Sequence, residues 1–345
     1  MMARRRAPRV AIALGSAALL MAASACSARS GPSDALRSLD ELRAPTTVVP
    51  STTATALSTT VSPTEQRCEA EALATKSYTP DPLPPVGEMA SGTTMRQIAD
   101  RGSLRVGVDE NTLGLASRNP TTGQIEGFEV ELAHEIAQRI FGDRDPARVE
   151  LIPVVTRNKT DIVAKGDVDL SINAISMTCA RWEDVAFSAE YYTAEQQLLV
   201  REDSEIRTVD DLSGRTVCVT AGSSSFDIME ERVPKATLLP VRARTECLLA
   251  LQNGEAEAYF GHDSFLYGMK PQDKTVEIRE GVIPGDTASH YGIAISHDHP
   301  DLVRFVNAVL DEIRTDGTWA ALHDRLETEL PGLPDATPPE PQYRG

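Results

Sequence analysis

The sequence predicts an α/β fold with mainly parallel sheets, divided between two lobes. Short apolar runs typical of strands alternate along the chain with segments whose apolar residues recur at helical spacing, and this alternation is characteristic of α/β proteins. The chain has 345 residues, which is more than one small domain needs and suits two lobes.

The first half of the folded body contains one strongly amphipathic segment. Phe128, Leu132, Ile136 and Ile140 share one helical face, and Gly142 ends that helix. The other expected elements are a helix at 95–101, a strand at 104–108, a turn at 119–123, a strand at 149–155, a short helix at 156–165 and a strand at 168–172.

The second half continues the alternation of strands and helices. Gly254 closes one helix, and a Pro-Gly pair at 284–285 marks a loop. The expected elements are extended segments at 191–201, 237–240 and 291–295, strands at 216–219 and 256–260, and helices after 221–225, at 245–252, at 302–313 and at 319–330.

The N-terminus carries the pattern of an export signal. Four arginines precede an apolar run at 10–22 that is too short to span a bilayer, and the small residues 23–25 lead directly to Cys26. This order predicts a signal peptide at 1–25. It also resembles a lipobox, in which Cys26 is lipidated and becomes the first mature residue, although alanine at 23 replaces the usual leucine. The alternative is an ordinary cleaved signal with an incidental cysteine.

Composition predicts three segments outside the folded body. Residues 26–66 are rich in Ser, Thr and Pro and should form a disordered tether between a lipid anchor and the body. Residues 67–94 include a Pro-rich run and are expected to form an extended arm on the surface. Residues 331–345 form a Pro-rich tail.

The charge balance limits the classes of partner. The chain carries 34 basic and 51 acidic residues, a formal net charge of −17, which argues against nucleic acid as the main partner. The six histidines are scattered and no two cysteines are closely spaced, so neither a metal site nor a cofactor is expected.

Nine short motifs follow one another along the folded body. They are Leu104-Arg-Val-Gly-Val-Asp109, Gly127-Phe-Glu-Val-Glu-Leu-Ala133, Gly166-Asp-Val-Asp-Leu170, Phe187-Ser-Ala-Glu-Tyr-Tyr192, Asp211-Leu-Ser-Gly-Arg-Thr-Val217, Ala221-Gly-Ser-Ser-Ser225, Ala250-Leu-Gln-Asn-Gly-Glu-Ala256, Tyr291-Gly-Ile-Ala294 and Asp316-Gly-Thr318. In these motifs and their order the chain resembles, from about residue 95 to 330, the family 3 solute-binding proteins, which are type II periplasmic-binding proteins for polar amino acids.

The resemblance implies a two-lobe (Venus-flytrap) fold with two hinge strands and a ligand cleft that closes by hinge motion. Lobe 1 would comprise 95–194 and 288–330, and lobe 2 would comprise 195–287. A monomer is expected. The resemblance implies a membrane partner, either the permease of an ABC importer or a membrane sensor protein.

Some relatives on this fold are dehydratases, and others carry a cell-wall lytic domain. Only a short tail follows residue 330, so no lytic domain is expected. A dehydratase would need an acid without an ammonium partner, so the expectation is a binding protein rather than an enzyme.

Family motifs place the ligand's α-carboxylate against Arg181, whose guanidinium can bind both carboxylate oxygens. Ser176 would add a hydroxyl and an N–H group. Ser223 and Ser224 would contribute N–H groups at a helix start, where anions are favoured, and an ordinary N-cap is the alternative for this serine run.

The ligand's α-ammonium is expected to pair with Asp263, with help from Ser176 and the backbone carbonyl of Ala174. A carboxylate inside a closed cleft requires a partner of opposite charge, and the ammonium would supply it. The alternative for Asp263 is that it caps the helix that follows.

The expected side-chain subsite combines two patterns of the family. Asp109 matches the aspartate of glutamine-binding members, whereas Thr156, Lys159 and Arg244 match positions of glutamate- and aspartate-binding members. This mixture predicts tolerance among glutamate, aspartate, glutamine and asparagine. The aromatic residue that usually covers the ligand is absent, since Thr112 and its neighbours stand there. The alternative for the two cations is a solvated surface.

Four cysteines besides Cys26 can form two disulfides in an oxidising compartment, and three pairings are possible. Because Cys218 and Cys247 would share lobe 2, the favoured pairs are Cys218–Cys247 and Cys68–Cys179. Free buried thiols are the alternative.

Overall fold

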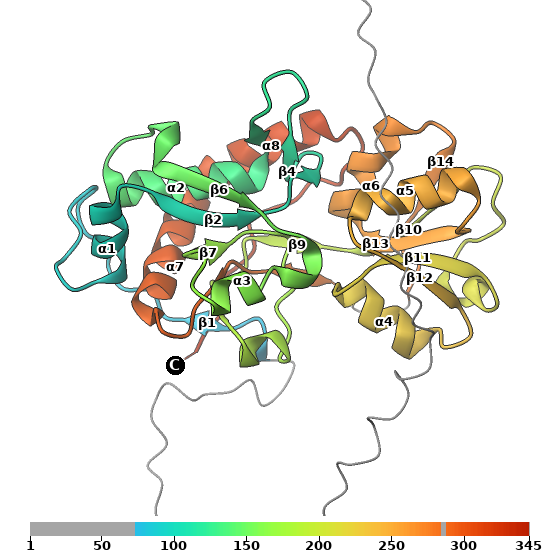
Figure 1. Ribbon diagram of the computed structural model, residues 1–345, viewed down its shortest axis with the longest axis horizontal. Coiled ribbons are helices and arrows are strands. Elements are labelled where there is room, and N and C mark those ends of the chain that lie inside the picture. Colours follow the sequence, from blue (N-terminus) through green and yellow to red (C-terminus); the bar gives the residue numbers. More distant parts are fainter. Residues whose placement is uncertain (1–72, 284–287, 345) are drawn as a thin grey trace, which may run out of the picture. The chain divides into compact units, whose positions relative to one another are not determined.

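The computed structural model describes residues 73–283 and 288–344, all within the compact unit that spans 61–345. The predicted signal peptide, Cys26, the tether and Cys68 lie outside the described residues. Two five-stranded sheets, each with its own helices, form two lobes (Figure 1).

Lobe 1 is built on a sheet with the strand order β6-β2-β7-β16-β8. Its strands are β2 (Leu104–Val108), β6 (Val149–Pro153), β7 (Leu170–Ser171), β8 (Ala186–Phe187) and β16 (Ala294–Ile295), and its helices are α1 (Thr94–Arg101), α2 (Phe128–Phe141), α3 (Asp161–Ala164), α7 (Pro300–Thr315) and α8 (Thr318–Glu329). A small sheet of β3 (Asn111–Thr112), β4 (Ala116–Arg118) and β5 (Ile125–Glu126) follows β2.

Lobe 2 is built on a sheet with the order β12-β11-β13-β10-β14. Its strands are β10 (Gln196–Arg201), β11 (Thr216–Thr220), β12 (Thr237–Val241), β13 (Ala258–His262) and β14 (Val276–Arg279), and its helices are α4 (Ser224–Arg232), α5 (Arg244–Asn253) and α6 (Asp263–Met269). Successive residues of β10 pack into different apolar clusters, Leu198 and Val200 into one and Leu199 into the other, because strand side chains alternate between the two faces of a sheet.

Short 3-10 helices connect several of these elements. They span Pro146–Arg148, Thr156–Asn158, Arg181–Glu183, Val209–Leu212 and Lys270–Gln272. Two antiparallel strands, β9 (Tyr192–Ala194) and β15 (Ser289–Tyr291), connect the lobes, with Tyr192 opposite Tyr291. They correspond to the expected hinge pair.

Both large sheets are mixed, and the expectation of mainly parallel sheets is corrected. In each sheet two strand pairings are parallel and two are antiparallel. The antiparallel pairings involve β10 in lobe 2 and β16 in lobe 1, which follow the hinge strands β9 and β15. These strands therefore enter the sheets directly from the hinge, without the crossover helix that a parallel pairing requires.

The arm and the tail pack on lobe 1, with the start of the arm buried and residues 79–88 partly or largely exposed. Strand β1 (Ser77–Tyr78) pairs in parallel with β17 (Tyr343–Arg344). Ser77 is fully buried, and its hydroxyl donates to the carbonyl of Phe187 at 2.7 Å. The Trp182 indole N–H donates to the Ala74 carbonyl at 2.7 Å, so the arm fills part of the lobe 1 core.

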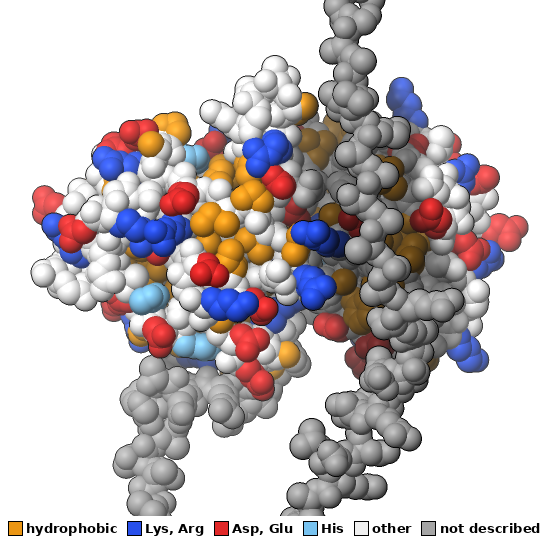
Figure 2. All heavy atoms as spheres, viewed as in Figure 1, with side chains coloured by type: hydrophobic (Ala, Val, Ile, Leu, Met, Phe, Trp, Pro, Cys, Tyr) orange, Lys and Arg blue, Asp and Glu red, His pale blue; other side chains and the backbone are white. Residues whose placement is uncertain are grey.

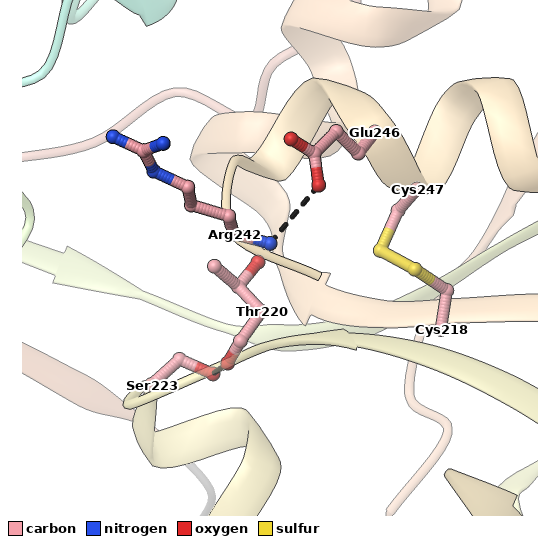
Figure 3. The surroundings of a disulfide bond; sticks show 6 residues. All are labelled: Cys218, Thr220, Ser223, Arg242, Glu246 and Cys247. Carbon is pink, nitrogen blue, oxygen red and sulfur yellow. Dashed lines mark hydrogen bonds between the residues drawn. A yellow bond between two sulfur atoms is a disulfide. The ribbon is translucent and has the colours of Figure 1, made fainter. Parts of the chain in front are cut away.

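A disulfide joins Cys218 of β11 to Cys247 of α5, with a Cα–Cα distance of 5.5 Å (Figure 3). This is the pair that the sequence favoured. The bond fastens α5, which begins at Arg244, to the strand that leads to Ser223. Cys179 is also disulfide-bonded, while its predicted partner Cys68 lies outside the described residues.

The surface carries charges of both signs. Lysine and arginine side chains are interspersed with aspartate and glutamate over the face shown in Figure 2, without a field of one sign. None of the helices in 73–283 and 288–344 has the length and apolar character needed to cross a membrane.

Candidate functional site

Three cationic side chains lie where the lobes meet; Lys159 and Arg244 are buried, and Arg181 is partly buried. Lys159 follows the 3-10 helix Thr156–Asn158, Arg181 begins the 3-10 helix Arg181–Glu183, and Arg244 is the first residue of α5. Lys159 is 4% exposed and Arg244 is 3% exposed, so the solvated-surface alternative does not apply to either residue.

Arg181 bridges the lobes through its guanidinium. Its Nη1 donates to the Ser176 carbonyl at 2.7 Å, and its Nη2 donates to the Gly222 carbonyl of lobe 2 at 3.2 Å. Burial lowers the pKa of Arg181 to about 10, with a smaller lowering by Arg244, while Asp227 opposes the shift. The group remains a cation at neutral pH.

Gly222 permits the close approach of lobe 2 at this point. Its φ is +77°, and a Cβ atom there would lie 2.8 Å from the Cα of Arg157 in lobe 1. Both the left-handed backbone and the contact therefore require glycine. Two residues after Gly222, the Ser224 hydroxyl lies 3.0 Å from the Ser176 hydroxyl across the lobe boundary.

Arg244 reaches from lobe 2 into a polar subsite of lobe 1. It forms a buried ion pair with Asp109 and donates to the Thr112 hydroxyl at 2.9 Å and to Asn173 Oδ1 at 3.2 Å. Its guanidinium lies 4.2 Å from the centroid of the Phe265 ring, in cation–π contact. Phe265 thus provides an aromatic face in a site where the expected aromatic is replaced by Thr112.

Lys159 is the least compensated of the three cations. Its Nζ donates to the Ala174 carbonyl at 3.2 Å. Burial, followed by repulsion from Arg181 and Arg244, lowers the pKa of Lys159 well below its usual range. Within the described part of the chain, Lys159 and Arg181 form hydrogen bonds only with backbone carbonyls and no ion pair with a carboxylate. A buried cation without a counter-charge favours binding of an anion.

A pocket of about 130 Å³ adjoins this cluster. It is lined by Asp109 and Thr156 from lobe 1 and by Arg242 and Ala243 from lobe 2, among others. Thr156 is 2% exposed, so it faces the lobe junction and not solvent. The structure therefore brings Asp109, Thr156, Lys159 and Arg244 together as the sequence predicted.

Asp263 lies outside this hydrogen-bonded cluster: in the part of the chain that the structure describes, it forms no hydrogen bond with the three cations or with Asp109. It is the first residue of α6, and its Oδ1 accepts the N–H of the adjacent Ser264 at 2.6 Å. The N-cap of α6 is His262, so Asp263 does not cap this helix. Burial raises the pKa of Asp263 to about 7, with further repulsion from Glu195 and Glu280. A buried carboxyl with this pKa is poised to ionise when a cation binds beside it.

Ser223 is the N-cap of α4. Its hydroxyl donates to the Thr220 carbonyl at 2.7 Å and accepts the Phe226 N–H at 3.1 Å, and its own N–H donates to Thr220. The structure thus shows the capping alternative for Ser223. In the same serine run, the Ser224 hydroxyl contacts lobe 1 through the Ser176 hydroxyl.

The sequence analysis missed residues that form hydrogen bonds with the site residues or pack against them. Glu129 of α2 is 1% exposed, accepts the Ala174 N–H at 2.7 Å and accepts the Tyr191 hydroxyl. Its motif was recognised, but an acid in the first turn of a helix is ordinarily a surface residue. Asn173 and Phe265 carried no signal in the sequence.

A second pocket, of about 520 Å³, lies on lobe 1 among α2, α7 and α8. Two of its cations already have partners, since Arg139 pairs with Glu312 and Arg144 pairs with Glu135. The lobe junction, with its uncompensated cations, is therefore the stronger candidate for ligand binding. No cluster of three or more His, Cys, Asp or Glu residues suited to a metal ion occurs in the described ranges.

Comparison with known proteins identifies the family. Residues 104–327 match the family described as bacterial extracellular solute-binding proteins, family 3. The ABC transporter glutamine-binding protein GlnH of Bacillus subtilis (strain 168) is 30% identical over 239 residues, which cover 69% of this chain and 86% of that protein.

Two further relatives extend the comparison. The glutamate-binding protein GluB of Corynebacterium glutamicum is 27% identical, with 68% of this chain and 82% of that protein covered. A crystal structure of a mutant of ArgBP from T. maritima matches with a TM-score of 0.62 and 28% identity, covering 68% of this chain and 99% of that one. This chain therefore belongs to family 3 of the bacterial extracellular solute-binding proteins.

Proposed function

We propose that the protein is an extracytoplasmic receptor that binds glutamate, aspartate, glutamine or asparagine between its lobes and delivers it to the permease of an ABC importer. The observation that carries this proposal is the pair formed by the buried Lys159 and the partly buried Arg181, which have no ion-pair partner among the described residues. The relatives named as glutamine- and glutamate-binding proteins support the same ligand class. The protein would act by binding and release, without catalysis.

In this proposal the three cations bind different ends of the ligand. Arg181 binds the α-carboxylate, with Ser176 and Ser224 beside it, because its guanidinium can form two parallel hydrogen bonds to a carboxylate. Lys159 and Arg244 face the distal group, and Thr156 lines the same end. Ser223 orients the serine run as the N-cap of α4.

The α-ammonium would bind near Asp263, the Ala174 carbonyl and Ser176. The ammonium supplies the positive charge that the buried Asp263 carboxyl lacks in the ligand-free protein. Calorimetric titration of the protein from about residue 66 onward with the common amino acids tests the proposed ligand class directly.

Asp109 should set the balance between carboxylate and amide ligands. Its ion pair with Arg244 cancels one of the two distal positive charges, so both neutral and anionic side chains can be accommodated. Replacing Asp109 by Asn frees the charge of Arg244 and should raise the ratio of glutamate to glutamine affinity by about tenfold, or about 1.4 kcal/mol. Titrations with the two ligands measure this ratio.

The matched control for this prediction is Glu110→Gln. Glu110 is the next residue, but it pairs with Arg118 and not with a cation of the site. The control variant should keep the wild-type ratio. A ratio that is unchanged in Asp109→Asn, or that shifts toward glutamine, would contradict the role proposed for Asp109.

We also propose that Cys26 carries a lipid that anchors the receptor to the outer face of the cell membrane. Such an anchor, ahead of the folded body in the chain, would keep the binding lobes near the permease. The Cys26→Ala protein should appear in the soluble extracytoplasmic fraction, as followed by membrane fractionation. Membrane retention equal to that of wild type would refute the anchor.

A further inference from the structure

Residues 173–176 of lobe 1 supply a hydrogen-bond acceptor to each of the three cations at the lobe junction. Asn173 accepts from Arg244, the Ala174 carbonyl accepts from Lys159, and the Ser176 carbonyl accepts from Arg181. The position of this one segment therefore sets the relative positions of the three cations.

Ala174 lies at the centre of this segment in an unusual conformation. Its φ is +45°, and it is the one non-glycine residue with positive φ in the described ranges. An L-residue reaches this conformation only when surrounding contacts impose it, and such residues cluster at functional sites. Glycine would adopt the same conformation without strain.

The contact that holds Ala174 comes from Glu129. The Glu129 Oε1 atom accepts the Ala174 N–H at 2.7 Å, and the same oxygen accepts the Tyr191 hydroxyl. Glu129 lies 45 residues away in the sequence, on α2, and the pair is buried. Burial raises the pKa of Glu129, although both hydrogen bonds and Arg244 oppose the shift.

An acid in the first turn of a helix has an ordinary explanation, namely its favourable interaction with the helix dipole. Glu131 occupies the same turn of α2 and fits that explanation, since it is partly exposed and pairs with Arg144. Glu129 differs because it is buried and points to a strained backbone group of another segment. The dipole alone does not account for burying a carboxylate there.

We infer that Glu129 is a positioning residue, whose buried carboxylate holds Ala174 in the left-handed conformation and thereby places the acceptors that organise Lys159, Arg181 and Arg244. For ligand affinity this inference rests on the proposed function. Loss of the acceptor at position 129 should let Ala174 relax and carry its carbonyl away from Lys159. The cations would then be held less accurately for an anionic ligand.

The test compares Glu129→Gln, which keeps an oxygen acceptor, with Glu129→Met, which has a similar size and no acceptor. Calorimetry with glutamate should give an affinity within about threefold of wild type for Gln and at least about tenfold weaker for Met. Glu131→Gln is the matched control and should bind like wild type. Adding Ala174→Gly to Glu129→Met should recover affinity at least about threefold, because glycine keeps positive φ without the clamp.

Crystal structures of the ligand-free variants provide a readout that does not depend on the proposed ligand. In Glu129→Met, residue 174 should leave the left-handed region and the bond from Lys159 Nζ to the Ala174 carbonyl should break. An unchanged torsion and bond, a wild-type affinity in Glu129→Met, or no recovery on adding Ala174→Gly would overturn the inference. If wild type binds none of the four amino acids, the proposed function fails while the crystal structures still decide the role of Glu129.

If Glu129→Met does not fold, Ala174→Gly in the wild-type background keeps the inference testable. Relief of strain at position 174 should leave the melting temperature unchanged or raise it. A lower melting temperature would contradict the strain on which the inference depends.

Discussion

Replacing Arg181 by Ala should weaken glutamate binding by about 2–5 kcal/mol, which is roughly 30- to 4,000-fold in the dissociation constant. In the proposed complex this guanidinium is the partner of the α-carboxylate, and its loss leaves a buried carboxylate without its main counter-charge. Arg181→Lys should recover only part of the affinity, because an ammonium cannot bind both oxygens in the planar arrangement of a guanidinium.

Stability should respond differently from affinity in the Arg181→Ala protein. Arg181 is a partly buried cation that is hydrogen-bonded to two backbone carbonyls, so removing it relieves a desolvation cost. We expect a ligand-free melting temperature equal to or above that of wild type, and a smaller rise on adding glutamate. Calorimetry and thermal melts on the same preparations measure both quantities.

Arg242→Ala is the matched control, because Arg242 lies on the rim of the pocket beside Asp109 and is exposed. Its removal lowers the local positive charge without affecting the cation that binds the ligand, and it should change affinity by less than about 1 kcal/mol. Wild-type affinity in Arg181→Ala, or an equal loss in the control, would refute the role of Arg181.

Replacing Asp263 by Asn should remove both the counter-charge of the α-ammonium and a pH dependence of binding. Burial raises the pKa of Asp263 to about 7 in the ligand-free protein, so the carboxyl is largely protonated below that pH. A bound ammonium favours the ionised form and lowers this pKa. Ligand binding should therefore release a proton near neutral pH, and affinity should rise as pH increases from about 6 to 8.

The effect of Asp263 on stability has the opposite sign. The unfolded carboxyl titrates near 3.8 and the folded one near 7, so between these values the folded state binds more protons. The free energy of unfolding of the ligand-free protein should thus fall as pH rises through this window. Asp263→Asn should flatten this slope and weaken glutamate binding by about 2–5 kcal/mol.

Titrations at pH 7 in two buffers with different ionisation enthalpies report the proton that binding releases. Wild type and Glu280→Gln, which removes a neighbouring charge but not the proposed ammonium partner, should both release a proton. Lys159, whose pKa is lowered by burial, makes an opposing contribution that is common to wild type and Asp263→Asn. The difference in proton release between the two proteins therefore reports Asp263 alone. Equal proton release in wild type and Asp263→Asn would exclude Asp263 as the partner of the ammonium.

Local patterns predicted much of the fold. Strand β2, helix α2 and the two C-terminal helices follow from apolar periodicity and from the glycines that end helices. Helix α6 is anticipated only as the helix that follows Asp263, without bounds. Its residues, 263–269, are all buried, so it has no polar face from which a helical period can be recognised.

Features that depend on distant parts of the chain could not be read in this way. The pairing of β1 with β17 joins segments more than 260 residues apart, and the mixed character of the sheets follows from the path of the hinge strands. No local period encodes such pairings.

The candidate site likewise combines residues that the sequence predicts with contacts that it does not predict. Arg181, Lys159, Asp109 and Arg244 could be named because family motifs fix their order along the chain. The ion pair between Asp109 and Arg244 spans 135 residues, and the support that Glu129 gives to Ala174 depends on burial. Neither is visible until the chain is folded.

The central claim is that the lobe junction binds a small amino acid with a carboxylate or amide side chain. Calorimetric titration of the wild-type protein from about residue 66 onward, with each of the common amino acids, tests it most directly. We predict saturable one-to-one binding of at least one of glutamate, aspartate, glutamine and asparagine, with lysine and arginine excluded by Lys159 and Arg244 at the distal end. Binding of none of the four, or a preference for lysine or arginine, would contradict the claim.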